Sequence, residues 1–162
     1  MMNESETTYV LDTSALLTLI EDEAGADVVQ SILESAGSDN VRILVSFMSF
    51  MEVFYNTLQE RDVEEAQTRV NLMESLPITR VESTASLCVT AARLKAKHRI
   101  SVADAWIASL AMERNAVLIH KDPEFEQAED ELEVLKLPYK DQIDRTNETN
   151  QTDQTKRARD GS

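Results

Sequence analysis

Short apolar segments alternate with longer amphipathic segments along this chain. The apolar runs Val10–Leu11, Ile43–Val45, Ile78–Val81 and Val117–Ile119 predict strands, and Leu132–Leu137 is a possible fifth strand. Between these runs, apolar residues recur every three or four positions, which is typical of helices with one buried face. Strands this short and apolar, separated by helices, indicate an α/β protein whose parallel sheet is covered on both faces.

The helices predicted from this spacing cover residues 14–21, 26–35, 47–59, 63–75, 83–97 and 101–114, with a short helix after Pro123. From Asp141 onward the composition changes to polar residues, and Ile143 is almost the only large apolar side chain. Such a segment buries too little surface to offset the entropy lost on ordering. We therefore predict one folded domain over residues 1–140 and a disordered polar tail over residues 141–162.

Composition and charge narrow the classes of function. The 162 residues are 42% hydrophobic, enough for a core, and the formal net charge is -14. This charge argues against a non-specific nucleic-acid coat or an anionic membrane as the main partner. It does not exclude a nuclease, because a local basic rim and a bound cation can outweigh the overall field at a site.

Cysteine content and hydropathy predict a cytoplasmic protein that does not enter membranes. Cys88 is the only cysteine and lies in an apolar-periodic stretch, so we expect a buried, inert thiol and a reducing compartment. The polar segment Met1–Thr8 does not resemble a signal peptide, and no stretch approaches the roughly 20 apolar residues of a membrane span.

Four carboxylates, Asp12, Glu52, Asp104 and Asp122, stand where an apolar run meets a helix start or interrupts an apolar helix face. Each has a purely structural interpretation. Asp12 and Asp122 can cap the helices that follow them, and Glu52 and Asp104 each stand three residues after a serine, as in a capping box. Together they favour a site, because parallel sheets bind ligands beyond the carboxyl ends of their strands.

Several carboxylates at one edge require protons or a cation, since two of them about 5 Å apart repel by roughly 3 kcal/mol at an effective dielectric near 20. Oxygen ligands select Mg²⁺ or Mn²⁺, and neither His98 nor His120 has the spacing of a zinc ligand. The chain has only three glycines, Gly25, Gly37 and Gly161, so it lacks the glycine-rich loops that bind phosphate in Walker or dinucleotide-binding motifs. A group of carboxylates with a bound Mg²⁺ or Mn²⁺ ion is suited to metal-assisted hydrolysis of a phosphodiester, with Glu52 or Asp122 orienting the water.

These motifs resemble the PIN-domain family, in particular its small VapC-like toxin branch. Leu11–Leu16 is similar to the first motif, Met51–Val53 to the second and Ser101–Ala108 to the third, while Asp122 occupies the fourth acidic position. The resemblance implies a three-layer α/β/α fold with sheet order 3-2-1-4-5 over the domain at residues 1–140. It also implies an Mg²⁺- or Mn²⁺-dependent endoribonuclease that forms homodimers and binds a cognate antitoxin near residues 47–75.

In the same resemblance Asp12 and Asp104 hold the metal, Glu52 and Asp122 complete the catalytic site, and the Ser14 hydroxyl supports it. The chain departs from the family at His120, where a Thr or Ser often stands two positions before the fourth acid. We favour a structural role for this imidazole over contact with water or phosphate.

Two further observations concern the RNA substrate and rival functions. Lys121 is a possible phosphate contact, and the basic run at residues 93–99 is the best candidate for contact with an RNA backbone, although a solvated helix face is an equal alternative. A haloacid-dehalogenase-like phosphatase would need a second Asp where Ser14 stands. A non-catalytic PIN-like binding module and an RNA-processing nuclease outside a toxin-antitoxin pair remain as alternatives.

Overall fold

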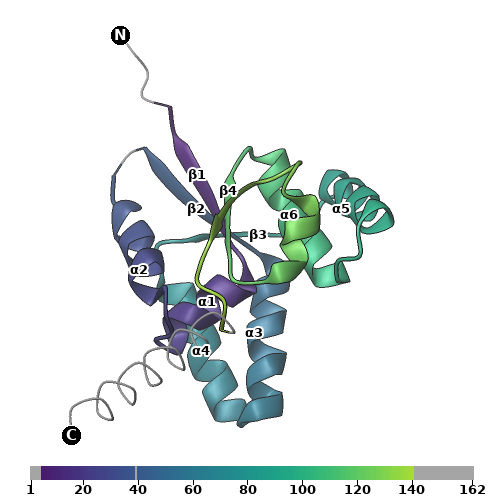
Figure 1. The fold of residues 1–162 in the computed structure, drawn as a ribbon. Helices are drawn as coiled ribbons and strands as arrows, with labels where there is room; N and C mark the ends of the chain where they lie inside the picture. The colour runs from purple at the N-terminus through teal and green to yellow at the C-terminus, as the bar shows by residue number, and fades with distance from the viewer. Residues whose placement is uncertain (1–4, 39, 141–162) are drawn as a thin grey trace, which may run out of the picture.

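A five-stranded parallel sheet in the order β3-β2-β1-β4-β5 forms the centre of the computed structural model, which describes residues 5–38 and 40–140 (Figure 1). The strands are β1 (Thr7–Leu11), β2 (Val41–Ser46), β3 (Thr79–Val81), β4 (Val117–His120) and β5 (Glu133–Lys136). The predicted fold class and strand order are confirmed. From β1 the chain continues to β2 and β3 on one side and then crosses to β4 and β5 on the other side, so the strand order reverses between β1 and β4.

Helices lie between nearly all the strands, close to their predicted positions. They are α1 (Thr13–Ile20), α2 (Ala26–Ser35), α3 (Phe47–Glu60), α4 (Val63–Ser75), α5 (Ala85–Lys97), α6 (Val102–Glu113) and the short 3₁₀ helix η1 (Pro123–Ala128). None of the helices within the described residues has both the length and the apolar character needed to cross a lipid bilayer.

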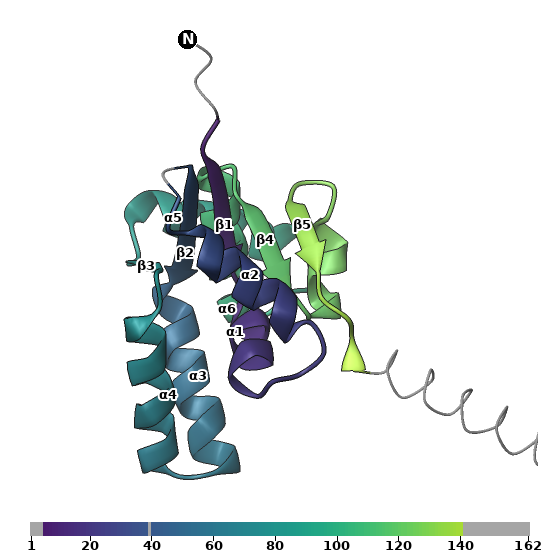
Figure 2. The ribbon, with the colours of Figure 1, turned by 90° about the vertical axis from the view of Figure 1, so that its left-hand side faces the viewer.

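The side chains of the central strands alternate between two apolar cores, as a two-residue period requires. Val10 and Leu118 belong to the core that α5 and α6 cover, whereas Leu11 and Ile119 belong to the core under α1 and α2. Figure 2 shows α1 and α2 in front of the sheet, with α5 and α6 behind it. Helix α6 contributes mostly small residues to its core, so this helix lies close against the sheet.

Helices α3 and α4 form an antiparallel pair that extends beyond the sheet on the side where α1 begins (Figure 2). Asp62 caps α4 by accepting the backbone N–H of Glu65 at 2.8 Å. Arg69 of α4 is buried, and its guanidinium binds Glu21 at 3.0 Å and Glu65 at 3.2 Å. Paired in this way, the buried cation ties α4 to the end of α1.

One local prediction is wrong. Cys88 is exposed, because it lies on the outer face of α5 while Leu87 and Ala91 point into the core. The purely structural alternative for Glu52, a capping box with Ser49, does not hold, because Ser46 caps α3 by accepting the N–H of Met48 at 3.2 Å. The predicted polar tail at 141–162 lies outside the described residues.

Candidate active site and metal centre

Asp12 stands at the end of β1 and caps α1. Its Oδ2 atom accepts the backbone N–H of Ser14 at 3.0 Å and also a short hydrogen bond from the Ser14 hydroxyl. The side chain is buried, and Oδ1 has no hydrogen-bond partner within the described residues. Oδ2 therefore has its hydrogen bonds as a helix cap, whereas Oδ1 is a buried acceptor without a donor among the described residues.

Ser14 also joins the ends of β1 and β4, the two strands between which the strand order reverses. Its hydroxyl oxygen accepts the backbone N–H of Lys121, just after β4, at 2.8 Å. Asp12 N–H donates in turn to the carbonyl of Ile119 in β4 at 3.0 Å. The segments that carry Asp12 and Asp122 are thus held together by hydrogen bonds across the sheet edge.

Glu52 lies in α3, one and a half turns from its start, and is half-buried. The Thr13 hydroxyl donates to its Oε1 at 2.7 Å, and the hydroxyl oxygens of Thr13 and Ser49 are hydrogen bonded at 3.0 Å. Because Thr13 follows Asp12 directly, this contact turns the Glu52 carboxylate toward the end of β1.

Asp104 lies in the first turn of α6 and is 5% exposed. Its backbone N–H donates to the Ser101 hydroxyl at 3.1 Å, so Ser101 caps the helix as the sequence suggested. The Asp104 carboxylate is left free of that cap. It meets the carboxylates of Asp122 and Glu124, and one oxygen from each of the three lies within 4.8 Å of the others.

Glu124 is a member of this cluster that the sequence did not reveal. Asp122 caps η1 by accepting the Glu124 N–H at 2.9 Å, and Glu124 Oε2 accepts the N–H of Ser101 at 3.2 Å. An acid in the first turn of a helix that begins with Pro123 is common for reasons of helix dipole alone. The sequence signal was therefore indistinguishable from ordinary helix chemistry.

The electrostatics of the cluster favour protons or a cation. Burial raises the pKa of Asp12 to about 7, with Glu52 and Asp122 adding repulsion. Burial also raises the pKa of Asp104, with a hydrogen bond to Glu124 and repulsion from Asp12 and Asp122 acting in the same direction. The pKa of Glu52 is raised chiefly by burial, against the hydrogen bond from Thr13.

Asp12, Glu52, Asp104 and Asp122 therefore converge at one sheet edge, with Glu124 beside them. A divalent cation fits this donor set, because every group is an oxygen ligand and Asp12 Oδ1 is a buried acceptor without a partner. The three carboxylates closest together include Asp104 but not Asp12.

His120 is fully buried at the end of β4 beneath the cluster. Its Nδ1 accepts the backbone N–H of Asp122 at 3.1 Å, and its ring packs against Phe125 with centroids 5.0 Å apart. Burial lowers its pKa, so the ring is neutral, and the acceptor role of Nδ1 puts the hydrogen on Nε2. This geometry favours the structural interpretation of His120.

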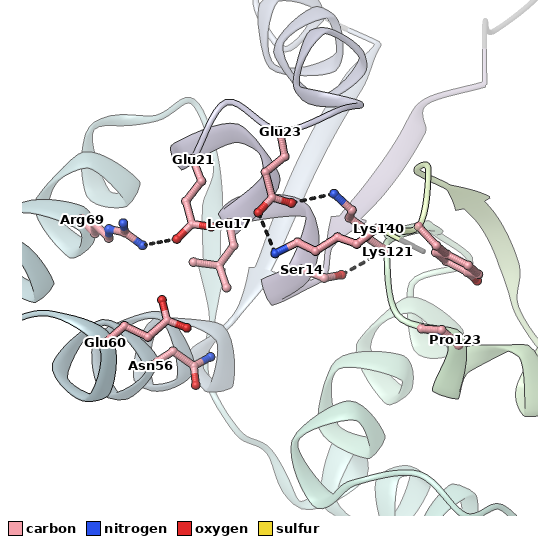
Figure 3. Close-up of a pocket in the computed structure, with 11 residues that line it drawn as sticks. Ser14, Leu17, Glu21, Glu23, Asn56, Glu60, Arg69, Lys121, Pro123 and Lys140 are labelled. Atoms are coloured by element: carbon pink, nitrogen blue, oxygen red, sulfur yellow. Dashed lines mark hydrogen bonds and ion pairs between the residues drawn. The ribbon is translucent and has the colours of Figure 1, made fainter. Parts of the chain in front are cut away.

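A pocket of about 410 Å³ adjoins the site on the side of α3 and α4 (Figure 3). Lys121 reaches into it and binds Glu23 at 2.6 Å, and Lys140 binds the other oxygen of Glu23 at 3.0 Å. Partial burial alone would raise the pKa of Glu23, but hydrogen bonds from the two lysines outweigh it and lower the pKa to about 2. Lys121, a possible phosphate contact, is therefore neutralised within the protein.

Comparison with known proteins identifies the family to which this fold corresponds. A protein-family model described as the PIN domain matches residues 9–131. Among curated proteins, none matches this sequence.

Several solved structures share the fold. VapBC2 from Rickettsia felis, bound to a DNA fragment from its promoter, is 21% identical with a TM-score of 0.68, covering 82% of this chain and 100% of that one. VapBC-1 from nontypeable Haemophilus influenzae is 23% identical with a TM-score of 0.60, over 80% and 98% of the two chains. VapC20 from Mycobacterium tuberculosis, described as a toxin that cleaves the sarcin-ricin loop, is 15% identical with a TM-score of 0.58, over 74% and 94% of the two chains.

Proposed function

The chain belongs to the PIN domain family, and we propose that it is an Mg²⁺- or Mn²⁺-dependent endoribonuclease that acts as the toxin of a toxin-antitoxin pair. The observation that carries the proposal is the convergence of acidic side chains from four separate segments at the carboxyl ends of β1 and β4, where the strand order reverses. A cluster of buried acids with raised pKa values is costly for the fold and useful for binding a cation.

The proposed roles follow from the surroundings of each carboxylate. Asp12 and Asp104 would hold the cation, with Asp122 and Glu124 completing its oxygen ligands. A divalent ion in such a site supplies neutralisation of charge on the scissile phosphate and a more acidic water. Ser14 fixes the orientation of Asp12 through two hydrogen bonds.

Glu52 is the proposed general base. The hydrogen bond from Thr13 fixes one of its carboxylate oxygens and leaves the other available to accept a proton from water. Partial burial raises the pKa of Glu52, which increases its affinity for the proton that this water releases. The buried His120 takes no part in proton transfer and instead supports the backbone of Asp122.

The proposed partner is an antitoxin, and the cytoplasm is the proposed location. Similar structures are described as VapBC pairs, some bound to DNA. In this chain the pocket between α1, α3 and α4 lies next to the acidic cluster, so a segment seated there would cover the approach to the site. We also propose a homodimer, on the family resemblance alone.

Cleavage of single-stranded RNA under Mg²⁺ titration tests the enzymatic part. Wild type is compared with Asp104→Asn and with the control Asp130→Asn, which alters an exposed acid after η1. We expect metal-dependent cleavage by wild type and the control and at least a hundredfold loss in Asp104→Asn. A folded wild-type protein without metal-dependent cleavage would contradict the proposal and favour a binding module.

Induced expression in bacterial cells tests the toxin part. We expect growth arrest with wild type and none with Asp104→Asn, and relief of the arrest when a neighbouring small DNA-binding protein is co-expressed. Cleavage in vitro combined with normal growth would instead identify an RNA-processing nuclease.

A further inference from the structure

A group of unpaired cations lies at the end of α5 and in the link to α6. Within residues 5–38 and 40–140, most lysine and arginine side chains form ion pairs with carboxylates. The described ones that form no ion pair are Arg61, Arg93, Lys95, Arg99 and Arg114. Three of these, Arg93, Lys95 and Arg99, fall within the seven residues from 93 to 99, and all three are exposed.

Two of these cations, Lys95 and Arg99, line a surface groove that leads to the acidic cluster. The groove has a volume of about 630 Å³ and is lined by residues 95–101 together with Glu124. We call it the basic groove. Glu124 also belongs to the group of carboxylates with Asp104 and Asp122, so the groove and the cluster share a wall. Lys95 is close enough to help lower the pKa of Glu124, although the hydrogen bond to Asp104 is the larger cause.

The walls of the basic groove are held to η1 and to the loop that follows it. Gln127 binds both backbone groups of Arg99, accepting its N–H at 3.0 Å and donating to its carbonyl at 3.1 Å. His98 Nε2 lies 2.6 Å from Glu131, which also binds Lys97 at 3.1 Å. The backbone that carries Arg99 is therefore fixed relative to Asp122 and Glu124, and the side chains of Lys95 and Arg99 stay free for an outside anion.

We propose that the basic groove binds the sugar-phosphate backbone of the single-stranded RNA substrate on one side of the scissile phosphodiester. This inference rests on the proposed ribonuclease function and adds the path of the substrate. A polyanion needs cations that are not neutralised within the protein, and the groove has them, whereas Lys121 and Lys140 on the opposite side share Glu23.

The arrangement of charge favours a strand over a small anion. The two free cations that line the groove stand on different parts of the chain, Lys95 in α5 and Arg99 in the link to α6, which suits successive phosphates of a strand. With a net charge of -14, the rest of the surface repels nucleic acid and confines it to this groove. At its end the strand meets the acidic cluster, where a divalent cation would allow a phosphate to approach the carboxylates.

Binding of labelled single-stranded RNA, followed by fluorescence anisotropy with Mg²⁺ present, tests the inference. The full chain with Asp104→Asn prevents cleavage and serves as the background. The double variant Lys95→Gln/Arg99→Gln is compared with Arg61→Gln/Arg114→Gln, which removes the same charge from two other unpaired, exposed positions.

We expect the groove variant to bind RNA on the order of tenfold more weakly at 0.1 M salt, and its plot of log K against log [salt] to lose about 1.4 of its slope, or about 0.7 per phosphate contact. The matched control should keep both values. With the natural Asp104, the same groove substitutions should raise KM for cleavage, while kcat and Mn²⁺ affinity stay close to wild type.

The outcomes separate this inference from the proposed function. If wild type cleaves RNA and the groove variant binds and cleaves it equally well, the inference is wrong and the ribonuclease proposal stands. If wild type neither cleaves nor binds RNA, both are wrong. If the groove variant loses binding to duplex DNA as well, and DNA binds wild type as tightly as RNA does, the groove serves DNA and its assignment to substrate is overturned.

Discussion

The hydroxyl oxygen of Ser14 accepts the backbone N–H of Lys121 at 2.8 Å and donates its own hydrogen to Asp12, joining positions that are 107 residues apart in sequence. One small side chain thus fixes the first acid of the cluster relative to the loop that carries the fourth. Lys121 is the first residue after β4, and Asp122 follows it directly.

Replacing Ser14 with Ala is expected to weaken metal binding about 10- to 100-fold, because an outer-shell partner that orients a ligand is lost. Stability should fall by about 1–2 kcal/mol, since the partly buried N–H of Lys121 loses its acceptor. Isothermal titration with Mn²⁺ and urea denaturation measure the two effects. Ser75→Ala, which removes an exposed hydroxyl bonded within α4, is the control and should change neither.

The metal-free protein is expected to lose stability as the pH rises from about 4 to about 7. The folded protein holds the Asp12 proton up to a pKa of about 7, whereas the unfolded chain releases it near 3.8. Between these values the unfolded state binds fewer protons, so the free energy of unfolding decreases with rising pH, by up to about 4 kcal/mol. Urea denaturation in EDTA at pH 5 and pH 8 measures the difference.

Asp12→Asn supplies the control for this pH effect. The amide does not titrate, so the variant should lose the part of the pH dependence that Asp12 contributes, keep the part that Asp104 contributes, and be more stable than wild type at pH 8 without metal. Adding Mn²⁺ should stabilise wild type far more at pH 8 than at pH 5. An identical pH profile in the two proteins would contradict the raised pKa of Asp12.

Glu124→Gln is expected to weaken Mn²⁺ binding roughly tenfold, because one of the three carboxylates that lie within 4.8 Å of one another loses its charge. The substitution should also lower the pKa of Asp104, since the hydrogen bond and the repulsion from Glu124 both help to raise it. Glu126→Gln, on the same 3₁₀ helix, is the matched control. Equal Mn²⁺ affinity in wild type and Glu124→Gln would remove Glu124 from the site.

His120→Ala and His120→Asn distinguish the packing of the imidazole from its role as a hydrogen-bond acceptor. Alanine leaves a cavity beside Phe125 and deprives the Asp122 N–H of its acceptor, so we expect a loss of about 2–4 kcal/mol in stability and weaker Mn²⁺ binding. Asparagine offers Oδ1 in place of Nδ1 and should keep most of the Mn²⁺ affinity. If both variants bind Mn²⁺ as wild type does, His120 does not position Asp122.

Local patterns were sufficient to predict the elements of the fold. The runs around Val10 and Leu118 were apolar enough to predict strands, and both are buried in the central sheet. The helix starts at Asp12, Ser101 and Asp122 also followed from residue type, because capping depends on neighbours two or three positions away. The capping-box pattern from Ser49 to Glu52 had no such counterpart in the structure, because Ser46 caps that helix instead.

By itself, then, the sequence determined the alternation of strands and helices and the acids that stand at their junctions, because hydrophobic periodicity and helix capping act over a few residues. Only the tertiary structure decided which of those acids meet. The inclusion of Glu124, the contact between Ser14 and Lys121, and the exposure of Cys88 all depend on how the loop after β4 and the face of α5 lie against other elements. Those positions are fixed by packing between segments distant in the chain, and no local pattern encodes them.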